Sequence, residues 1–286
     1  MTDACLVDGA LAPPRTIRAP KRTLLWLEQR ALFEVGAFGA AAPWLRLMGR
    51  GDRHPVLVLP GFTAGDLTTV PLRWQLRTWG YWAHGWRLGI NLGPTTDVME
   101  GMIQRLDALH VRHGRKVTLI GWSLGGIYAR ELARLHPEMV RSVITLGSPY
   151  RMTLADRSSV SILVDRLAAN FDAELALAWA SEDDRVPLTV PATSIYTRTD
   201  GVVRWHTCID RAGDQRENIE VPGSHSGLGF NPAVLYVIAD RLAQPEGDWR
   251  PFAAPPLLRR FYPRPAEWAD EQTRVLARAE RSARAH

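Results

Sequence analysis

From residue 54 onward, short apolar runs of strand length alternate with longer segments that have helical periodicity. The first apolar run is Pro55–Leu59, which ends at Pro60-Gly61, and the first helical segment is Leu67–Trp79. Two parallel strands must be joined by a crossover connection of about a dozen residues or more, and a helix usually forms it. The alternation therefore predicts an α/β chain with a mostly parallel central sheet and helices on both faces.

The same stretch contains further elements of both kinds. The other expected strands are Tyr81–Leu88, Lys116–Gly121, Arg141–Leu146, Thr193–Tyr196 and Asn218–Val221. The other expected helices are Asp97–His113, Leu124–Leu135 and Pro232–Leu242. Residues 150–190 break the alternation, because they contain amphipathic pieces but no strand pattern. We interpret them as a helical cap above the carboxyl ends of the strands, where such sheets carry their sites.

A length of 286 residues corresponds to one large domain or two small ones. We expect residues 54–149 and 191–243 to form the α/β core, with the cap of residues 150–190 inserted between them. Residues 1–53 are expected to form an N-terminal helical extension. Residues 244–286 are expected to form a Pro-rich segment followed by an Arg-rich helix.

The N-terminal extension contains an apolar-rich stretch at residues 24–48. Charged and polar residues interrupt it at Glu28, Gln29, Arg30, Glu34 and Arg46. A membrane-spanning helix needs about 20 predominantly apolar residues, so we do not expect this stretch to span a membrane. Five of its residues recur at helical spacing, namely Leu24, Leu27, Ala31, Leu32 and Val35. We expect this face to pack on the core, and the alternative is peripheral contact with a membrane.

Composition excludes several classes of protein. Hydrophobic residues make up 46% of the chain and charged residues 23%, which is inconsistent with a disordered chain. The net charge of +5 is spread along the chain without a nucleic-acid-binding motif, so no nucleic-acid partner is expected. The two cysteines, Cys5 and Cys208, do not indicate a disulfide framework. With no secretory signal pattern at the N-terminus, a cytoplasmic location is expected.

The most informative motif is Gly121-Trp122-Ser123-Leu124-Gly125-Gly126, which lies between an expected strand and an expected helix. A nucleophilic serine on a sharp strand-to-helix turn needs small neighbours, because the bend brings backbone segments together. The pattern alone would also fit a glycine-rich turn with an inert serine. The flanking strand and helix favour Ser123 as a nucleophile.

A serine hydroxyl needs a neighbouring base to remove its proton. Of the eight histidines, His225 lies in a loop of small residues between the last expected strand and a helix. Such a loop at the carboxyl edge of the sheet can place an imidazole over the serine. His225 is therefore the candidate base, with His84 and His206 as reserve candidates.

The base in turn needs an acid that holds its tautomer and stabilises the imidazolium. Asp200 directly follows an expected strand, whereas the competing Asp184 lies before that strand. We favour Asp200, since its side chain would emerge at the same sheet edge as Ser123. Two backbone N–H groups are expected to form an oxyanion hole, those of Leu124 and Phe62.

Four segments together resemble the α/β-hydrolase superfamily, and more narrowly its bacterial serine esterase and lipase branch. They are Leu59-Pro60-Gly61-Phe62, Gly121-Trp122-Ser123-Leu124-Gly125-Gly126, Thr199-Asp200-Gly201-Val202-Val203 and Gly223-Ser224-His225-Ser226-Gly227. The resemblance covers residues 54–242 and implies an α/β-hydrolase fold and transfer of an ester acyl group to water, with no cofactor and no metal. Many lipases carry His-Gly where this chain has Pro60-Gly61, so the resemblance assigns no lipase subfamily.

These features predict a carboxylic-ester hydrolase that acts through an acyl-enzyme on Ser123. Trp122, Phe62, Leu124 and the apolar residues of 150–190 suggest a hydrophobic acyl pocket, and so a hydrophobic small-molecule ester as substrate. The same residues would serve an acyltransferase, a thioesterase or an amidase. The alternative from another class is a non-catalytic binding protein, for which we would expect a broken triad. The sequence leaves the oligomeric state open.

Overall fold

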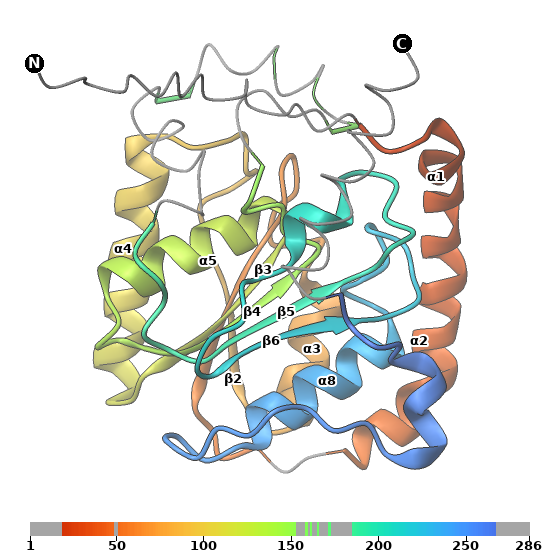
Figure 1. The fold of residues 1–286 in the computed structure, drawn as a ribbon. Coiled ribbons are helices and arrows are strands. Elements are labelled where there is room, and N and C mark those ends of the chain that lie inside the picture. The colour runs from red at the N-terminus through yellow and green to blue at the C-terminus, as the bar shows by residue number, and fades with distance from the viewer. Residues whose placement is uncertain are drawn as a thin grey trace, which may run out of the picture.

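Six parallel strands form the centre of the molecule (Figure 1). In this computed structural model, the described residues are 19–48, 51–152, 158–159, 161, 165, 171–172 and 185–266. The strands are β1 (Pro55–Leu59), β2 (Trp82–Gly85), β3 (Val117–Trp122), β4 (Val140–Leu146), β5 (Ala192–Tyr196) and β6 (Arg216–Glu220). Their order in the sheet is β2-β1-β3-β4-β5-β6. Every pairing in this sheet is parallel, in agreement with the expected fold class.

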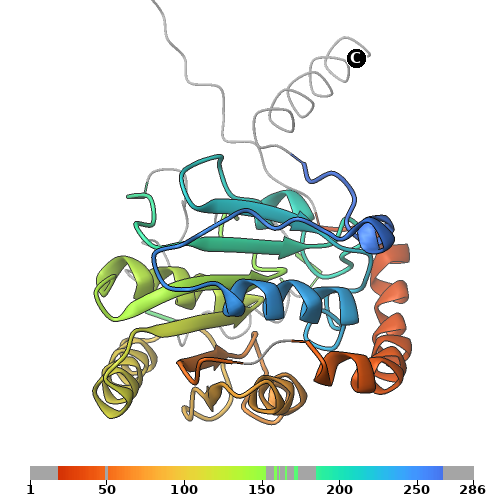
Figure 2. The same ribbon diagram turned by 90° about the horizontal axis from the view of Figure 1, so that it is seen from below.

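Helices cover both faces of the sheet (Figures 1 and 2). They are α3 (Val70–Thr78), α4 (Thr96–His113), α5 (Leu124–Leu135) and α8 (Pro232–Ala243). The chain also forms α1 (Arg22–Leu27), the 3-10 turn η1 (Glu28–Arg30) and α2 (Ala31–Arg46) before the sheet. Two further 3-10 segments, η4 (Trp205–Cys208) and η5 (Pro256–Phe261), complete the described elements.

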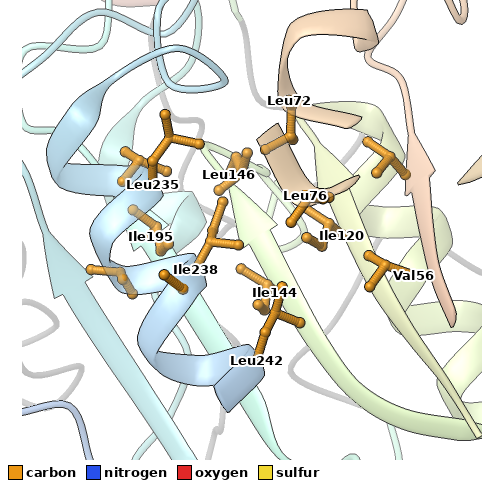
Figure 3. Close-up of a cluster of buried hydrophobic side chains, with 14 of the residues drawn as sticks. Val56, Leu72, Leu76, Ile120, Ile144, Leu146, Ile195, Leu235, Ile238 and Leu242 are labelled. Atoms are coloured by element: carbon orange, nitrogen blue, oxygen red, sulfur yellow. The ribbon is translucent and has the colours of Figure 1, made fainter. Parts of the chain in front are cut away.

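Successive residues of the central strand β1 enter two different cores. Val56 and Val58 of β1 pack in a cluster with α3 and α8, whereas Leu57 and Leu59 pack with α4 and α5. Figure 3 shows part of the first cluster, where Leu76 of α3 and other side chains from helices and strands converge. Because both of its faces are buried, the central strand β1 is a continuous apolar run, whereas the edge strand β6 carries charged residues. This double coverage holds the carboxyl ends of all six strands at one edge.

The expected elements of the core are present with small differences at their ends. Pro55–Leu59 and Leu124–Leu135 have the predicted bounds. β2 is shorter than predicted and ends at Gly85, because the Asp66 carboxylate accepts the N–H of Trp86 and of Arg87 and draws the chain out of the sheet.

The helical segment before the sheet packs through a face that matches the predicted one only at Leu24 and Ala31. Leu27, Leu32 and Val35 are 44%, 78% and 47% exposed, so the prediction that they pack on the core is wrong. The side chains on the inner face are half-buried or buried and include Leu24, Glu28, Ala31, Glu34, Phe38 and Leu45. Phe38 and Leu45 pack against the cluster that contains α8. Of the helices that the structure describes, none has the length and apolarity to cross a membrane.

Some predictions concern residues outside the described part of the chain. Cys5 and the Arg-rich helix near the C-terminus lie there, as do most residues of the cap. Two of the described cap residues contact loops at the carboxyl ends of the strands, whereas Arg185 pairs with Glu131 of α5. The N–H of Ser159 donates to the carbonyl of Val202 over 2.8 Å. The N–H of Asp172 donates to the carbonyl of Pro94 over 3.0 Å.

Candidate active site

Ser123 lies on the turn that joins β3 to α5. β3 ends at Trp122 and α5 begins at Leu124, so the turn consists of this single residue. Its backbone dihedrals are φ 53° and ψ −122°, a conformation that is rare for any residue other than glycine and costs free energy. A hydrogen bond of 2.9 Å from the Ser123 N–H to the carbonyl of Leu146 in β4 helps to hold this turn. The strand, turn and helix expected around Ser123 are therefore present.

Glycines on both sides of Ser123 make this turn sterically possible. A Cβ at Gly121 would collide with the backbone of Gly125 and Gly126, and a Cβ at Gly125 would collide with the carbonyl of Leu59 in β1. The backbone of α5 therefore begins in direct contact with the strands beside it. This contact explains why the sequence places small residues at both positions.

The loop after β1 lies against the serine. A Cβ at Gly61 would lie 3.2 Å from the Cβ of Ser123 and 3.9 Å from its Oγ. Within the described residues, no hydrogen bond is formed by the N–H of Phe62 in this loop or by the N–H of Leu124. Both predicted oxyanion donors are thus free in the segments that adjoin Ser123.

A buried asparagine holds this loop in place. Asn91 donates from Nδ2 to the carbonyl of Pro60 over 2.9 Å, and the backbone carbonyl of Asn91 accepts the N–H of Thr63 over 2.7 Å. The hydroxyl of Tyr128 in α5 donates to Asn91 Oδ1 over 3.1 Å. Our sequence reasoning missed Asn91, since only the folded chain brings it beside residues 60–63.

His225 and Asp200 form a buried pair. Nδ1 of His225 lies 2.6 Å from Oδ2 of Asp200, and the two residues are 6% and 3% exposed. The other carboxylate oxygen of Asp200 accepts the N–H groups of Val202 and Val203, both over 2.8 Å. The carboxylate therefore holds Nδ1 as the protonated nitrogen, which leaves Nε2 as a proton acceptor. The pair packs over Gly147, where a Cβ would lie 3.1 Å from His225 Nδ1.

The same interaction changes the protonation equilibrium of His225. Burial acts to lower its pKa, but the charge of Asp200, its hydrogen bond and the charge of Glu28 outweigh burial, so the pKa of His225 is raised. A buried carboxylate thus favours the imidazolium that forms when the ring accepts a proton.

Ser123 and His225 face one pocket of about 450 Å³. The lining is mainly apolar and consists of Gly61, Phe62, Thr63, Ala64, Thr68, Trp122, Ser123, Val202, His225, Ser226 and Phe230. The indole N–H of Trp122 donates to the carbonyl of His225 over 3.1 Å, which ties the two loops together. Among the described residues, the ring of His225 is hydrogen-bonded to Asp200 and not to the Ser123 hydroxyl. Catalytic hydrogen bonds of this kind often tighten only when substrate binds.

The apolar residues expected around the substrate divide into two groups. Phe62 and Trp122 line the pocket, and Phe171 from the predicted cap packs edge-on against Phe62 at 6.4 Å between ring centroids. Leu124 instead packs in the cluster with α4 and α5. Phe230, from the loop before α8, also lines the pocket, and the sequence patterns did not point to it.

The reserve candidates do not line this pocket. His84 Nε2 lies 3.0 Å from Nε2 of His113, and burial with nearby arginines lowers the pKa of His84 to about 4. His206 stacks on Trp205. Asp184 lies outside the described residues. The described residues contain no group of three or more His, Cys, Asp and Glu side chains arranged to hold a metal ion.

Comparison with known proteins identifies the fold. Residues 94–176 match the sequence profile of the family described as "alpha/beta hydrolase fold". The structure is similar to that of Aspergillus fumigatus lipase B, with 18% identity, a TM-score of 0.52, and 69% of this chain and 54% of that chain covered. The chain has the α/β-hydrolase fold. The fold inferred from the four sequence motifs is thereby confirmed.

A second solved structure supports the same α/β-hydrolase arrangement. The propeptide form of Bacillus licheniformis lipase BlEst2 has 16% identity and a TM-score of 0.50, with 71% of this chain and 52% of that chain covered. Our chain thus spans about half the length of each of these two lipases. At these identities the likeness concerns the fold alone. No curated protein matches the chain significantly.

Replacing Gly125 with alanine tests the close backbone contact beneath Ser123. We expect Gly125→Ala to lower the free energy of unfolding by about 1–3 kcal/mol, because the new Cβ meets the Leu59 carbonyl, which cannot move aside cheaply. Gly36→Ala in α2 is the matched control, since nothing lies within 4 Å of a Cβ there. It should gain about 0.5–1 kcal/mol from helix propensity. Urea denaturation measures both, and equal effects would contradict the contact.

Proposed function

We propose that the protein is a serine carboxylic-ester hydrolase in which Ser123, His225 and Asp200 form a catalytic triad. The observation that carries this proposal is the buried pair of Asp200 and His225 at the pocket that Ser123 lines. The strained backbone of Ser123 supports it, because unusual dihedrals at a strand-to-helix turn are typical of the nucleophile of this fold. The order of the three residues along the chain is also that of α/β-hydrolases.

The proposed reaction begins with attack of Ser123 Oγ on the ester carbonyl carbon while Nε2 of His225 takes the hydroxyl proton. Asp200 stabilises the imidazolium. The N–H groups of Phe62 and Leu124 bind the oxyanion of the tetrahedral intermediate, which collapses when His225 protonates the leaving alcohol. Water then attacks the acyl-enzyme while Nε2 of His225 takes its proton. The second tetrahedral intermediate collapses when His225 gives that proton to Ser123 Oγ, which breaks the acyl bond to the serine and releases the acid.

Other uses of the same acyl-enzyme are an acyltransferase, a thioesterase or an amidase. Hydrolysis differs from acyl transfer in that it needs no acceptor other than water, whereas a thioesterase or an amidase would differ only in the leaving group. An added alcohol that outcompetes water would reveal transfer. A non-catalytic binding protein fits less well, since the buried carboxylate, the imidazole and the serine are all in place.

Replacing the nucleophile tests the proposed reaction directly. We expect Ser123→Ala to lose several orders of magnitude in kcat on a nitrophenyl ester while its unfolding transition stays close to that of the unchanged protein. An organophosphonate probe followed by peptide mapping should place the adduct on Ser123. Ser226 serves as the internal control, because it also lines the pocket. An adduct on Ser226, or retained activity in the variant, would contradict the assignment.

The apolar pocket predicts a preference for hydrophobic acyl chains. Each methylene group that becomes buried contributes about 0.8 kcal/mol, so kcat/KM should rise about fourfold per methylene from acetyl to longer nitrophenyl esters until the pocket is full. A series of nitrophenyl esters with acyl chains of increasing length measures this dependence. A strict preference for acetyl would contradict an acyl site lined by Phe62, Trp122 and Phe230.

We also propose that the outer face of α1 and α2 contacts an anionic lipid surface. This face consists of exposed Trp26, Leu32, Phe33, Trp44 and Leu47, which are 73–80% exposed. Glu28 and Glu34 point inward to backbone N–H groups, so these acidic residues of the segment do not oppose such contact. Exposed Lys21, Arg22 and Arg46 at its ends add positive charge. Apolar residues with flanking basic ones are typical of interfacial helices.

Vesicle flotation tests this surface. The protein should float with vesicles that contain anionic phospholipid, and Leu32→Gln/Phe33→Gln should reduce binding about a hundredfold or more, because two large side chains no longer enter the interface. Val111→Gln is the matched control, since Val111 on α4 is 71% exposed but lies outside this face. Failure to bind vesicles, or a dimer in sedimentation that the double variant abolishes, would overturn the proposal.

A further inference from the structure

Glu28 of η1 joins two loops that are distant in the sequence. Its Oε1 accepts the N–H of Gly201 over 2.8 Å and the N–H of His225 over 3.0 Å. Its Oε2 accepts the N–H of Ser226 over 2.8 Å. Gly201 directly follows Asp200, so a single carboxylate binds the backbone beside the acid and the backbone of the base.

Two neighbours of Glu28 bind the same pair of loops. Arg30 donates from Nη2 to the carbonyls of Thr199 and Gly223, both over 3.2 Å. Glu34 Oε1 accepts the N–H of Ser224 over 2.7 Å. Three side chains from residues 28–34 therefore hold the backbone of residues 199–201 and 223–226.

Both loops pack closely against this helical segment. A Cβ at Gly201 would collide with the carbonyl of Leu24, and a Cβ at Gly227 would collide with Oε2 of Glu34. The loop after β5 therefore depends on Gly201 to approach backbone of the helix, whereas Gly227 leaves room for the Glu34 side chain. Such close fits at two separate positions indicate a built contact rather than a chance encounter of surface charges.

We propose that Glu28 is a positioning residue that holds the Asp200 loop and the His225 loop in register, so that the acid–base pair is aimed at Ser123. This role rests on the proposed hydrolase function. Charge-assisted hydrogen bonds from backbone N–H groups to a carboxylate are stronger than neutral ones, and three of them converge here. The contact also explains why polar residues interrupt an otherwise apolar helical segment.

Glu28 affects His225 through its charge as well as its hydrogen bonds. Among the described residues, the charged side chains that hydrogen-bond to the His225 loop are Asp200, Glu28, Arg30 and Glu34. Burial opposes the imidazolium, and Asp200 and then Glu28 favour it, with the net result that the pKa of His225 is raised. Removal of the Glu28 charge should therefore lower the pKa of His225, and the ring should remain a proton acceptor at lower pH.

Glu34 provides a matched comparison on the same helical segment. Burial raises its pKa, its Oε2 has no hydrogen-bond partner among the described residues, and it is not among the groups that shift the pKa of His225. Glutamine at position 34 can still accept the Ser224 N–H through its amide oxygen. Glutamine at position 28 instead loses both the charge and one of the two acceptor oxygens.

The experiment compares Glu28→Gln, Glu28→Asp and Glu34→Gln. We expect Glu28→Gln to lower kcat about ten- to a hundredfold with little change in KM, since small misplacement of a catalytic group is costly. Its acid limb of kcat/KM should move to lower pH. Glu28→Asp keeps the charge but is one methylene shorter, so it should lower kcat and leave the limb in place. Glu34→Gln should leave the limb in place.

NMR titration of the His225 ring gives a second readout that does not require activity. The pKa of His225 should fall in Glu28→Gln and stay unchanged in Glu34→Gln, with urea denaturation confirming that each variant folds. An unchanged pKa in Glu28→Gln, or an equal fall in both variants, would overturn the role of Glu28. Absence of phosphonate labelling at Ser123 in the unchanged protein would instead overturn the hydrolase function, so the two failures are distinguishable.

Discussion

The parallel pairing of the six strands is the constraint on which the candidate site depends. Because each strand runs in the same direction, the loops that follow β1, β3, β5 and β6 all emerge at one edge of the sheet. Those loops carry Phe62, Ser123, Asp200 and His225. Burial of both faces by helices stabilises this direction of pairing, since parallel sheets are stable only when covered on both sides.

At the carboxyl edge of this sheet, the turn at Ser123 carries unfavourable backbone strain. A non-glycine residue with φ 53° is unfavourable by itself, and it persists because the surrounding structure determines it. The β3 strand below, the α5 helix after it and the β1 strand beside it meet through Gly121 and Gly125. The free energy gained by burying apolar side chains in the two cores thus offsets the backbone strain at Ser123, which faces the pocket.

The N-terminal helical segment departs from the usual distribution of side chains between residues 28 and 34, although Phe38 and Leu45 further along pack on the core. Its polar residues Glu28, Arg30 and Glu34 point toward the protein, and large apolar residues such as Leu32 and Phe33 point outward. Periodicity alone assigns the apolar side of a helix to the core. Here the inner side must instead satisfy the backbone N–H and C=O groups of two loops, and carboxylates and a guanidinium do this where apolar residues cannot. The same segment therefore carries an exposed apolar face and contacts the backbone of the proposed base.

The sequence by itself determined the order of strands and helices, because apolar runs and helical periodicity report burial directly. It also determined which serine, histidine and aspartate to consider, since small residues around Ser123 and His225 and a strand before Asp200 are local signals. Only the tertiary structure decided the parts that depend on contacts between distant segments. Asn91 beneath the Phe62 loop, Gly147 beneath the acid–base pair and Glu28 across both loops act through hydrogen bonds or packing to backbone far away in the chain. Backbone groups have the same chemistry at every residue, so no sequence pattern marks the partner that each of these residues finds.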